Sequence, residues 1–261
     1  MMKASIWRLS QGNLERLLNF ASPILLLLLW EACARINVID VRFFPAPSKI
    51  FTQLLVLVES GLLWKHFYAS MERLFWGFLF GGLPALVLGV SMGLNRTLRM
   101  LVEPLISATY PVPKSAILPL VLLIFGLGES SKIVMVGIGI FFPIVINAMA
   151  GVLEIHKIHF DVAQNFGAGR WQVFRTVALP GAMPLILTGV KLGIGMGLVL
   201  ISIAEMMGAR SGLGFMMWSA WEIMAVETMY VGLIVIAILG IVFTQLITEI
   251  ENLIVPWKRG R

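Results

Sequence analysis

Long stretches without a charged side chain limit what this sequence can fold into. Residues 74–95, 133–153 and 228–248 are uncharged over 22, 21 and 21 positions, and they are strongly apolar. A helix needs about 20 such residues to cross the hydrocarbon layer of a bilayer. Because barrel strands are short and alternate in polarity, these continuous runs predict helices that span a membrane.

The composition agrees with a membrane location. Apolar residues make up 59% of the 261 positions and charged residues only 13%, whereas soluble proteins carry about 25% charged residues. The apolar surface that this requires excludes a soluble enzyme and a disordered chain. A single cysteine, Cys33, excludes a disulfide-stapled secreted module. The net charge of +6 comes from basic residues dispersed between apolar runs, so we interpret it as membrane orientation and expect no nucleic-acid partner.

The gaps between charges predict an all-α, polytopic membrane protein with six transmembrane helices in one domain, residues 1–261. The predicted spans are residues 21–39, 74–95, 104–128, 132–153, 184–206 and 228–249. The first contains Glu31 and Arg35, which can neutralise each other at a spacing of four. An alternative for this span is a signal peptide cleaved after Ala32-Cys33-Ala34, which the charge of Glu31 disfavours.

Lysine and arginine are enriched in short cytoplasmic segments. With a cytoplasmic N-terminus, the inner segments hold 11 basic residues and the outer segments seven. We therefore expect both termini in the cytoplasm, with residues 154–180 as a cytoplasmic loop. On the outer side we expect a short amphipathic helix capped by Ser48 and closed by Gly61. A second outer loop, residues 207–227, turns at its glycines.

The cytoplasmic loop has the pattern of a helix, a glycine turn and a second helix. Asp161 is expected at the first helix's N-terminus and Gly167 in the turn. Arg170 and Trp171 then begin a second helix that ends at Pro180. Such an element suits a docking surface for a partner protein. The alternative is a loop lying on the membrane, with its basic residues facing lipid phosphates.

This loop resembles the EAA loop of ABC importer permeases, whose pattern is Glu-Ala-Ala, three residues, Gly, nine residues, Ile-x-Leu-Pro. The matching positions are Ala163, Gly167, Leu179 and Pro180, while Asp161, Val162 and Val177 replace Glu, Ala and Ile. Further stretches resemble the branch of the family that imports sulfonates, taurine and nitrate; they lie in residues 44–47, 111–132, 187–191 and 204–215.

The resemblance implies the type I permease fold of ABC importers, in the cytoplasmic (inner) membrane of a bacterium. It implies a homodimer that binds two cytoplasmic ATP-binding subunits and an extracytoplasmic substrate-binding protein. The residues implied to couple the ATPase to the membrane pathway are Asp161, Ala163, Gly167, Leu179 and Pro180. ATP and Mg²⁺ belong to the partner subunits, since this chain has no G-x-x-x-x-G-K-S/T sequence. We expect the chain itself to bind no cofactor.

Candidate residues for the translocation path lie in the third and fifth spans. Pro111, Pro113 and Pro119 predict a broken helix that lines the path, or a kink that serves packing alone. Lys114 is expected either to attract an anionic solute or to reach the cytoplasmic interface. In the fifth span, Lys191 is expected to be an anchor at the inner end.

Small residues spaced four apart allow two helices to approach closely. Gly189, Gly193 and Gly197 therefore either border the path or pack within one subunit. Glu205, near the outer end of the same span, is expected to hydrogen-bond at the gate.

No residue pattern predicts catalysis or a metal site. His156 and His159 are three apart, as in some metal sites, but a solvated helix face explains them better. We therefore expect an ABC importer permease for a small anion such as a sulfonate, taurine or nitrate. The alternatives are a permease for a neutral vitamin precursor, a secondary transporter driven by an ion gradient, and an intramembrane enzyme.

Overall fold

The computed structural model describes residues 21–256, which are helical and contain no strand. The all-α prediction is confirmed for this part of the chain. Residues 21–35 form the first helix described. The others are α2 (Pro47–Glu59), α3 (Leu62–Gly77), α4 (Leu83–Leu94), α5 (Arg96–Thr109), α6 (Leu118–Phe125), α7 (Glu129–Leu153), α8 (Lys157–Asn165), α9 (Arg170–Val173), α10 (Leu179–Met206), α11 (Leu213–Glu222) and α12 (Val226–Ile254), with short π and 3₁₀ turns η1 (Phe78–Gly82), η2 (Lys114–Ile117) and η3 (Phe174–Ala178).

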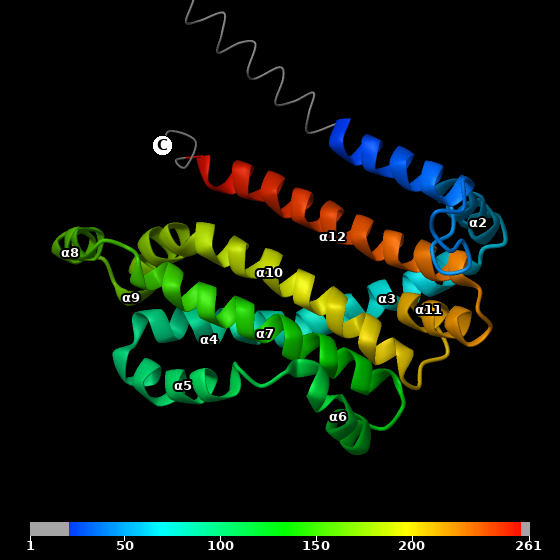
Figure 1. The fold of residues 1–261 in the computed structure, drawn as a ribbon. Coiled ribbons are helices and arrows are strands. Elements are labelled where there is room, and N and C mark those ends of the chain that lie inside the picture. The colour runs from blue at the N-terminus through cyan, green and yellow to red at the C-terminus, as the bar shows by residue number, and fades with distance from the viewer. Residues whose placement is uncertain (1–20, 257–261) are drawn as a thin grey trace, which may run out of the picture.

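Helices α7 and α10 lie side by side at the centre of the bundle, with α3–α4 against them and α12 on the other side (Figure 1). Helices α8 and α9 lie at one end of the molecule, and α2 and α11 lie at the opposite end (Figure 1).

Four helical stretches in the described residues are long and apolar enough to cross a membrane: Leu62–Leu94, Glu129–Leu153, Arg170–Met206 and Val226–Ile254. A fifth candidate is the pair formed by α5 and residues Lys114–Phe125, bent by 87°. The structure thus supports four or five of the six predicted spans. The first predicted span is helical over residues 21–35. Residues 1–20 and 257–261, with basic residues used to predict orientation, lie outside the described residues.

Two helices extend beyond the predicted bounds. The helix that contains residues 74–95 begins at Leu62, and Arg73 is buried within it and paired there. The helix from Arg170 does not end at Pro180 but continues to Met206. It passes through the π turn η3, just before Pro180 near the start of α10. A π turn widens the helix locally, and η3 lies where the proline withdraws an N–H from the hydrogen-bond ladder.

The core is built around α7. Its side chains Met135, Val136 and Ile140 are fully buried. Helix α3–α4 crosses α7 so closely that a Cβ added at Gly81 would overlap the backbone of Gly137. Only glycine at position 81 permits this approach.

The first helix, α2 and α12 form an outer layer. The rings of Trp30 and Tyr230 lie 5.5 Å apart. The predicted helix at residues 48–59 is confirmed as α2, and Gly61 ends it with φ of 74°. Ser48 is not its cap: the carboxylate of Glu31 accepts the Ser48 N–H at 3.0 Å and its hydroxyl at 2.8 Å.

Candidate functional site

A buried cluster of charges joins three helices near the α11 end of the bundle. The Arg73 guanidinium, on α3, is 3% exposed; it contacts the Glu129 carboxylate at the start of α7 at 2.5 Å and that of Glu205 on α10 at 2.8 Å. The Glu205 side chain is fully buried, whereas that of Glu129 is 65% exposed. Burying unpaired charges is costly, so this arrangement keeps the three helices together.

The same cluster holds the loop that follows α10. Ser70 donates its hydroxyl to Glu205 at 2.8 Å and accepts the Leu213 N–H at 2.8 Å. Glu205 also accepts the Gly214 N–H at 2.9 Å, so it caps the N-terminus of α11. The predicted outer loop at residues 207–227 therefore contains a helix that sequence analysis missed. Gly212 has φ of 116°, and a Cβ there would overlap the Glu205 carboxylate.

Sequence analysis predicted Glu205 as a hydrogen-bonding residue but missed its partners. His66, Ser70 and Arg73 share one face of α3, at spacings of four and three. His66 accepts the Gly212 N–H at 3.1 Å. This polar stripe at the edge of an apolar run was the available signal. Because Arg73 directly precedes an uncharged run, the sequence pattern assigns it to the end of a span and gives no sign that it is buried.

The third predicted span is broken where its prolines are. Helix α5 ends at Thr109, and the chain resumes as η2 and α6 after Pro111 and Pro113. Pro119 lies in the first turn of α6. A proline at this position does not destabilise the helix, because the N–H groups of the first turn have no hydrogen-bond acceptor within the helix.

The Lys114 ammonium lies inside this break. It donates hydrogen bonds to the carbonyl oxygens of Thr109, Tyr110 and Val112 at 2.8, 3.0 and 3.0 Å. It also lies 3.9 Å from the centre of the Phe142 ring. The residue is 8% exposed. An ammonium has three N–H donors, so these three carbonyls account for all of them.

The glycine stripe on α10 faces α7. A Cβ at Gly189 would lie 3.0 Å from the carbonyl oxygen of Pro143, and one at Gly193 would lie 3.2 Å from that of Ile140. A Cβ at Gly197 would lie 3.0 Å from the Ile140 side chain and 3.1 Å from that of Leu74 on α3. These contacts correspond to packing within one subunit, one of the two interpretations of the stripe.

Lys191, predicted as an anchor, forms an ion pair inside the bundle. Its ammonium lies 2.6 Å from the carboxylate of Glu251 on α12. The pair ties the end of α12 to the middle of α10.

The predicted coupling loop forms an exposed platform at the other end of the bundle (Figure 1). Helix α8 has no buried residue. Gly167 turns the chain with φ of 77°, as predicted. Asp161 does not begin α8, because it lies in the middle of that helix. A groove of about 570 Å³ between α8 and the start of α10 brings together several predicted residues; its lining is Ile155, His159, Val162, Ala163, Thr176, Val177, Pro180 and Gly181.

Large apolar side chains on this platform face outward. Phe166 is 89% exposed and Trp171 is 72% exposed. Ile158 and Val162 precede Phe166 at spacings of four and are also exposed. His156 and His159 are exposed too. Within residues 21–256, no three His, Cys, Asp or Glu side chains are grouped to hold a metal.

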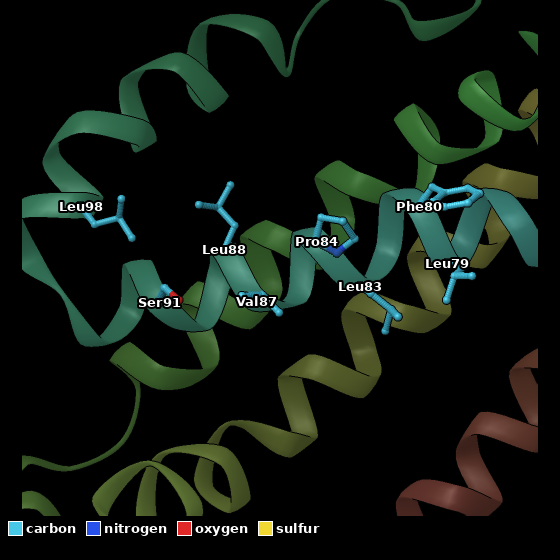
Figure 2. Close-up of a pocket in the computed structure, with 8 residues that line it drawn as sticks. All are labelled: Leu79, Phe80, Leu83, Pro84, Val87, Leu88, Ser91 and Leu98. Carbon is cyan, nitrogen blue, oxygen red and sulfur yellow. The ribbon is translucent and has the colours of Figure 1, made fainter. Parts of the chain in front are cut away.

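A second hollow, of about 620 Å³, lies between α4 and α5. Figure 2 shows its lining, which comes from η1, α4 and Leu98 of α5. Ser91 is the one polar side chain among the eight. A solute with a charged group would find no oppositely charged side chain in this lining, so we do not choose this hollow as the candidate solute site.

The sequence matches a known family of membrane proteins. Residues 85–259 match the family described as the binding-protein-dependent transport system inner membrane component. The chain belongs to this family. It is therefore a multi-pass permease of the inner membrane.

Curated relatives agree with this assignment. The permease is 35% identical to the taurine transport system permease protein TauC of Escherichia coli, over 96% of this chain and 92% of the relative. It is 32% identical to the putative aliphatic sulfonates transport permease SsuC of Escherichia coli, over 90% of each. The riboflavin transport system permease RibX of Chloroflexus aurantiacus is 29% identical over 90% of this chain. These relatives are transporter subunits, so the permease is not an enzyme.

A solved structure shares the fold. A chain of the MetNI methionine ABC transporter in an inward facing conformation matches 77% of the permease, with a TM-score of 0.60 and 21% identity. The match covers 98% of that chain. At this identity the comparison shows the ABC importer permease fold alone.

Proposed function

We propose that the permease moves a small solute across the inner membrane by alternating access, as a homodimer driven by two ATP-binding subunits. The observation that carries this proposal is the exposed α8–α9 platform, joined to the bundle by one continuous helix, Arg170–Met206. A partner that displaces α9 would tilt α10. Because α10 packs on α7 along the glycine stripe, the core would follow as a rigid body.

The platform has the properties of a protein contact. An exposed apolar surface marks an interaction site, and no segment within residues 21–256 covers Phe166 or Trp171. We assign the ATPase contact to the platform, with Asp161, Ala163, Gly167, Leu179 and Pro180 as its coupling residues. ATP and Mg²⁺ would be bound by the partner subunits.

We place the path beside the broken third span. Pro111, Pro113 and Pro119 are the candidates to line it, since irregular backbone at membrane depth needs cover from protein or water. The glycine stripe of α10 packs on α7. We place this stripe behind the path, at Gly189, Gly193 and Gly197. Glu205 holds the outer end, where a separate binding protein would deliver the solute.

The solute that we favour is a sulfonate, taurine, nitrate or a similar small anion. The taurine and sulfonate relatives match nearly the whole chain. The riboflavin relative favours a second candidate, a neutral vitamin precursor. Substrate choice lies largely with the binding protein, so we propose a thermal-shift screen of the cognate binding protein. A tight ligand raises the melting temperature of the protein that binds it. Small sulfonates should raise it, and tight ligands that are all neutral or cationic would contradict an anionic solute.

The coupling assignment is tested by bulky substitutions in the platform. In a complex reconstituted with its ATPase and binding protein, Gly167→Val should abolish ATP-driven uptake, because valine resists a φ of 77°. Asp161→Trp should weaken association with the ATPase. The matched control is Gly169→Ala, because Gly169 has φ of −70° and a Cβ there meets nothing within 4 Å. Uptake and association that survive both substitutions would refute the assignment.

A further inference from the structure

The break in the third span has a feature that the transport cycle above does not use. Three backbone carbonyl oxygens, of Thr109, Tyr110 and Val112, converge on one buried point, and the Lys114 ammonium occupies it. The face of the Phe142 ring lies against the same ammonium. Carbonyl oxygens and a ring face all carry partial negative charge.

The sequence explains why carbonyls gather there. The last four carbonyls of a helix have no partner within that helix, and the C-terminal end of α5 is negative through the helix dipole. Pro111 and Pro113 have no N–H to offer. A break of this kind in a membrane protein therefore needs a donor or a cation.

A second lysine donates hydrogen bonds to backbone carbonyls at the other end of α6. Lys132 is fully buried, and its ammonium donates to the carbonyl oxygens of Leu127 and Gly128 at 2.7 and 2.9 Å. The carbonyl of Gly208 lies at 3.4 Å from the same nitrogen. Both irregular segments that flank α6 are thus closed by an ammonium of the chain itself.

In ion-coupled transporters, unwound carbonyls and helix C-terminal ends bind a cation from solution. We propose that Lys114 is a covalently attached cation that closes the break in the third span and takes that place. It is a positioning residue, which holds α6 at 87° to α5. Its consequence for transport rests on the proposed function: the break beside the path stays closed without a cation from solution.

This role competes with the expectation that Lys114 binds an anionic solute. All three donors of its ammonium are engaged by carbonyls, so an anion could bind only after the break loses its cation. Closing the break and binding an anionic solute predict different rescue of a variant that lacks the Lys114 side chain. A cation with N–H donors can restore the break, whereas an anion cannot.

The test is chemical rescue of thermal stability in the full-length chain, purified in lipid nanodiscs. Lys114→Ala removes three carbons and the ammonium, which are the atoms of n-propylammonium. We expect this variant to melt about 5 °C lower, because buried carbonyls are left unsatisfied. Added n-propylammonium should restore most of that loss. Tetramethylammonium, which has the charge but no N–H donor, should restore none.

Two further variants serve as controls. Lys114→Met keeps the length of the side chain and lacks the ammonium, so it should be destabilised and not respond to n-propylammonium. Lys49→Ala, at an exposed lysine on α2, should melt like the wild type in either salt. A Lys114→Ala chain that is as stable as the wild type would overturn the proposal. A rise in melting temperature with n-propylammonium that is equal in the wild type would do so too.

Transport separates this inference from the proposed function. Rescue by n-propylammonium in a complex that accumulates no solute would contradict the proposed function and leave the role of Lys114 intact.

Discussion

At the level of single residues, Arg73 and Glu205 show how strongly a buried charge depends on its partner. Arg73 is shared between two carboxylates, and Glu205 also accepts bonds from Ser70 and Gly214. Removing one member of a buried ion pair is expected to cost about 3–5 kcal/mol, because the other charge stays buried.

We therefore expect Arg73→Met and Glu205→Gln each to lower the melting temperature strongly. The double variant should be less destabilised than the sum of the two, since the second change removes a charge that the first left unpaired. Thermal unfolding of all four chains in nanodiscs gives this coupling. Strictly additive losses would show that the two charges act independently.

Glu129 pairs with the same guanidinium, but its side chain is largely exposed. Water can solvate it when the pair is broken, and exposed pairs contribute little. Glu129→Gln should therefore melt within a few degrees of the wild type. A loss as large as that of Glu205→Gln would contradict this division between a buried and an exposed partner.

At the level of helices, the crossing of α3–α4 over α7 depends on an absent side chain. A Cβ at Gly81 would overlap the backbone of Gly137, which has no side chain to move aside. A Cβ at Gly195 on α10 would meet nothing within 4 Å. Gly81 therefore provides the test position, and Gly195 provides the control position.

Gly81→Ala should separate the helices and destabilise the chain by about 1–3 kcal/mol, the usual cost of overpacking a core. Gly195→Ala should leave stability unchanged or slightly higher, because alanine favours helix more than glycine does. Melting temperatures of the two variants check this. A harmless Gly81→Ala would mean that the crossing tolerates a wider spacing.

The α8–α9 platform is the element that meets the partner in our proposal. Phe166→Glu should lower the affinity for the ATP-binding subunits about tenfold or more, as loss of an aromatic anchor does. Because Phe166 is exposed, the permease alone should melt as before. The control is Ile223→Glu, an exposed residue at the α11 end of the bundle. Equal loss of affinity in both variants would argue against a localised contact.

At the level of the whole molecule, the two ends of the bundle differ in what they expose. A buried charge cluster joins three helices at the α11 end, and the platform at the opposite end carries exposed apolar side chains, to which our proposal assigns the ATPase contact. The continuous helix Arg170–Met206 connects them. This division suits a machine that receives a mechanical input at one end and gates a solute at the other.

We expect uptake in proteoliposomes to require ATP and the ATP-binding subunits, and to persist when an uncoupler collapses the proton gradient. A secondary transporter would behave in the opposite way. Uptake measured with and without each component decides between them. Proton-dependent uptake without ATP would contradict our proposal.

Much of this molecule follows from local patterns. Uncharged runs predicted the helices around α4, α7 and α12, because a backbone in lipid must form its hydrogen bonds internally. Gly167 was predictable as a turn, because glycine alone accepts its φ without strain. Pro111 and Pro113 predicted the break in the third span. Each of these inferences concerns a residue and its near neighbours in the chain.

What the sequence left open was where each charge lies and what it contacts. Arg73 reads as the end of a span, yet it is buried against a carboxylate 132 positions away. The cap of α11 comes from Glu205 on the preceding helix, and the Lys114 ammonium donates to backbone carbonyls of the preceding turn. These contacts depend on how the helices pack, because a buried charge is stable only where the fold brings a partner within hydrogen-bond distance.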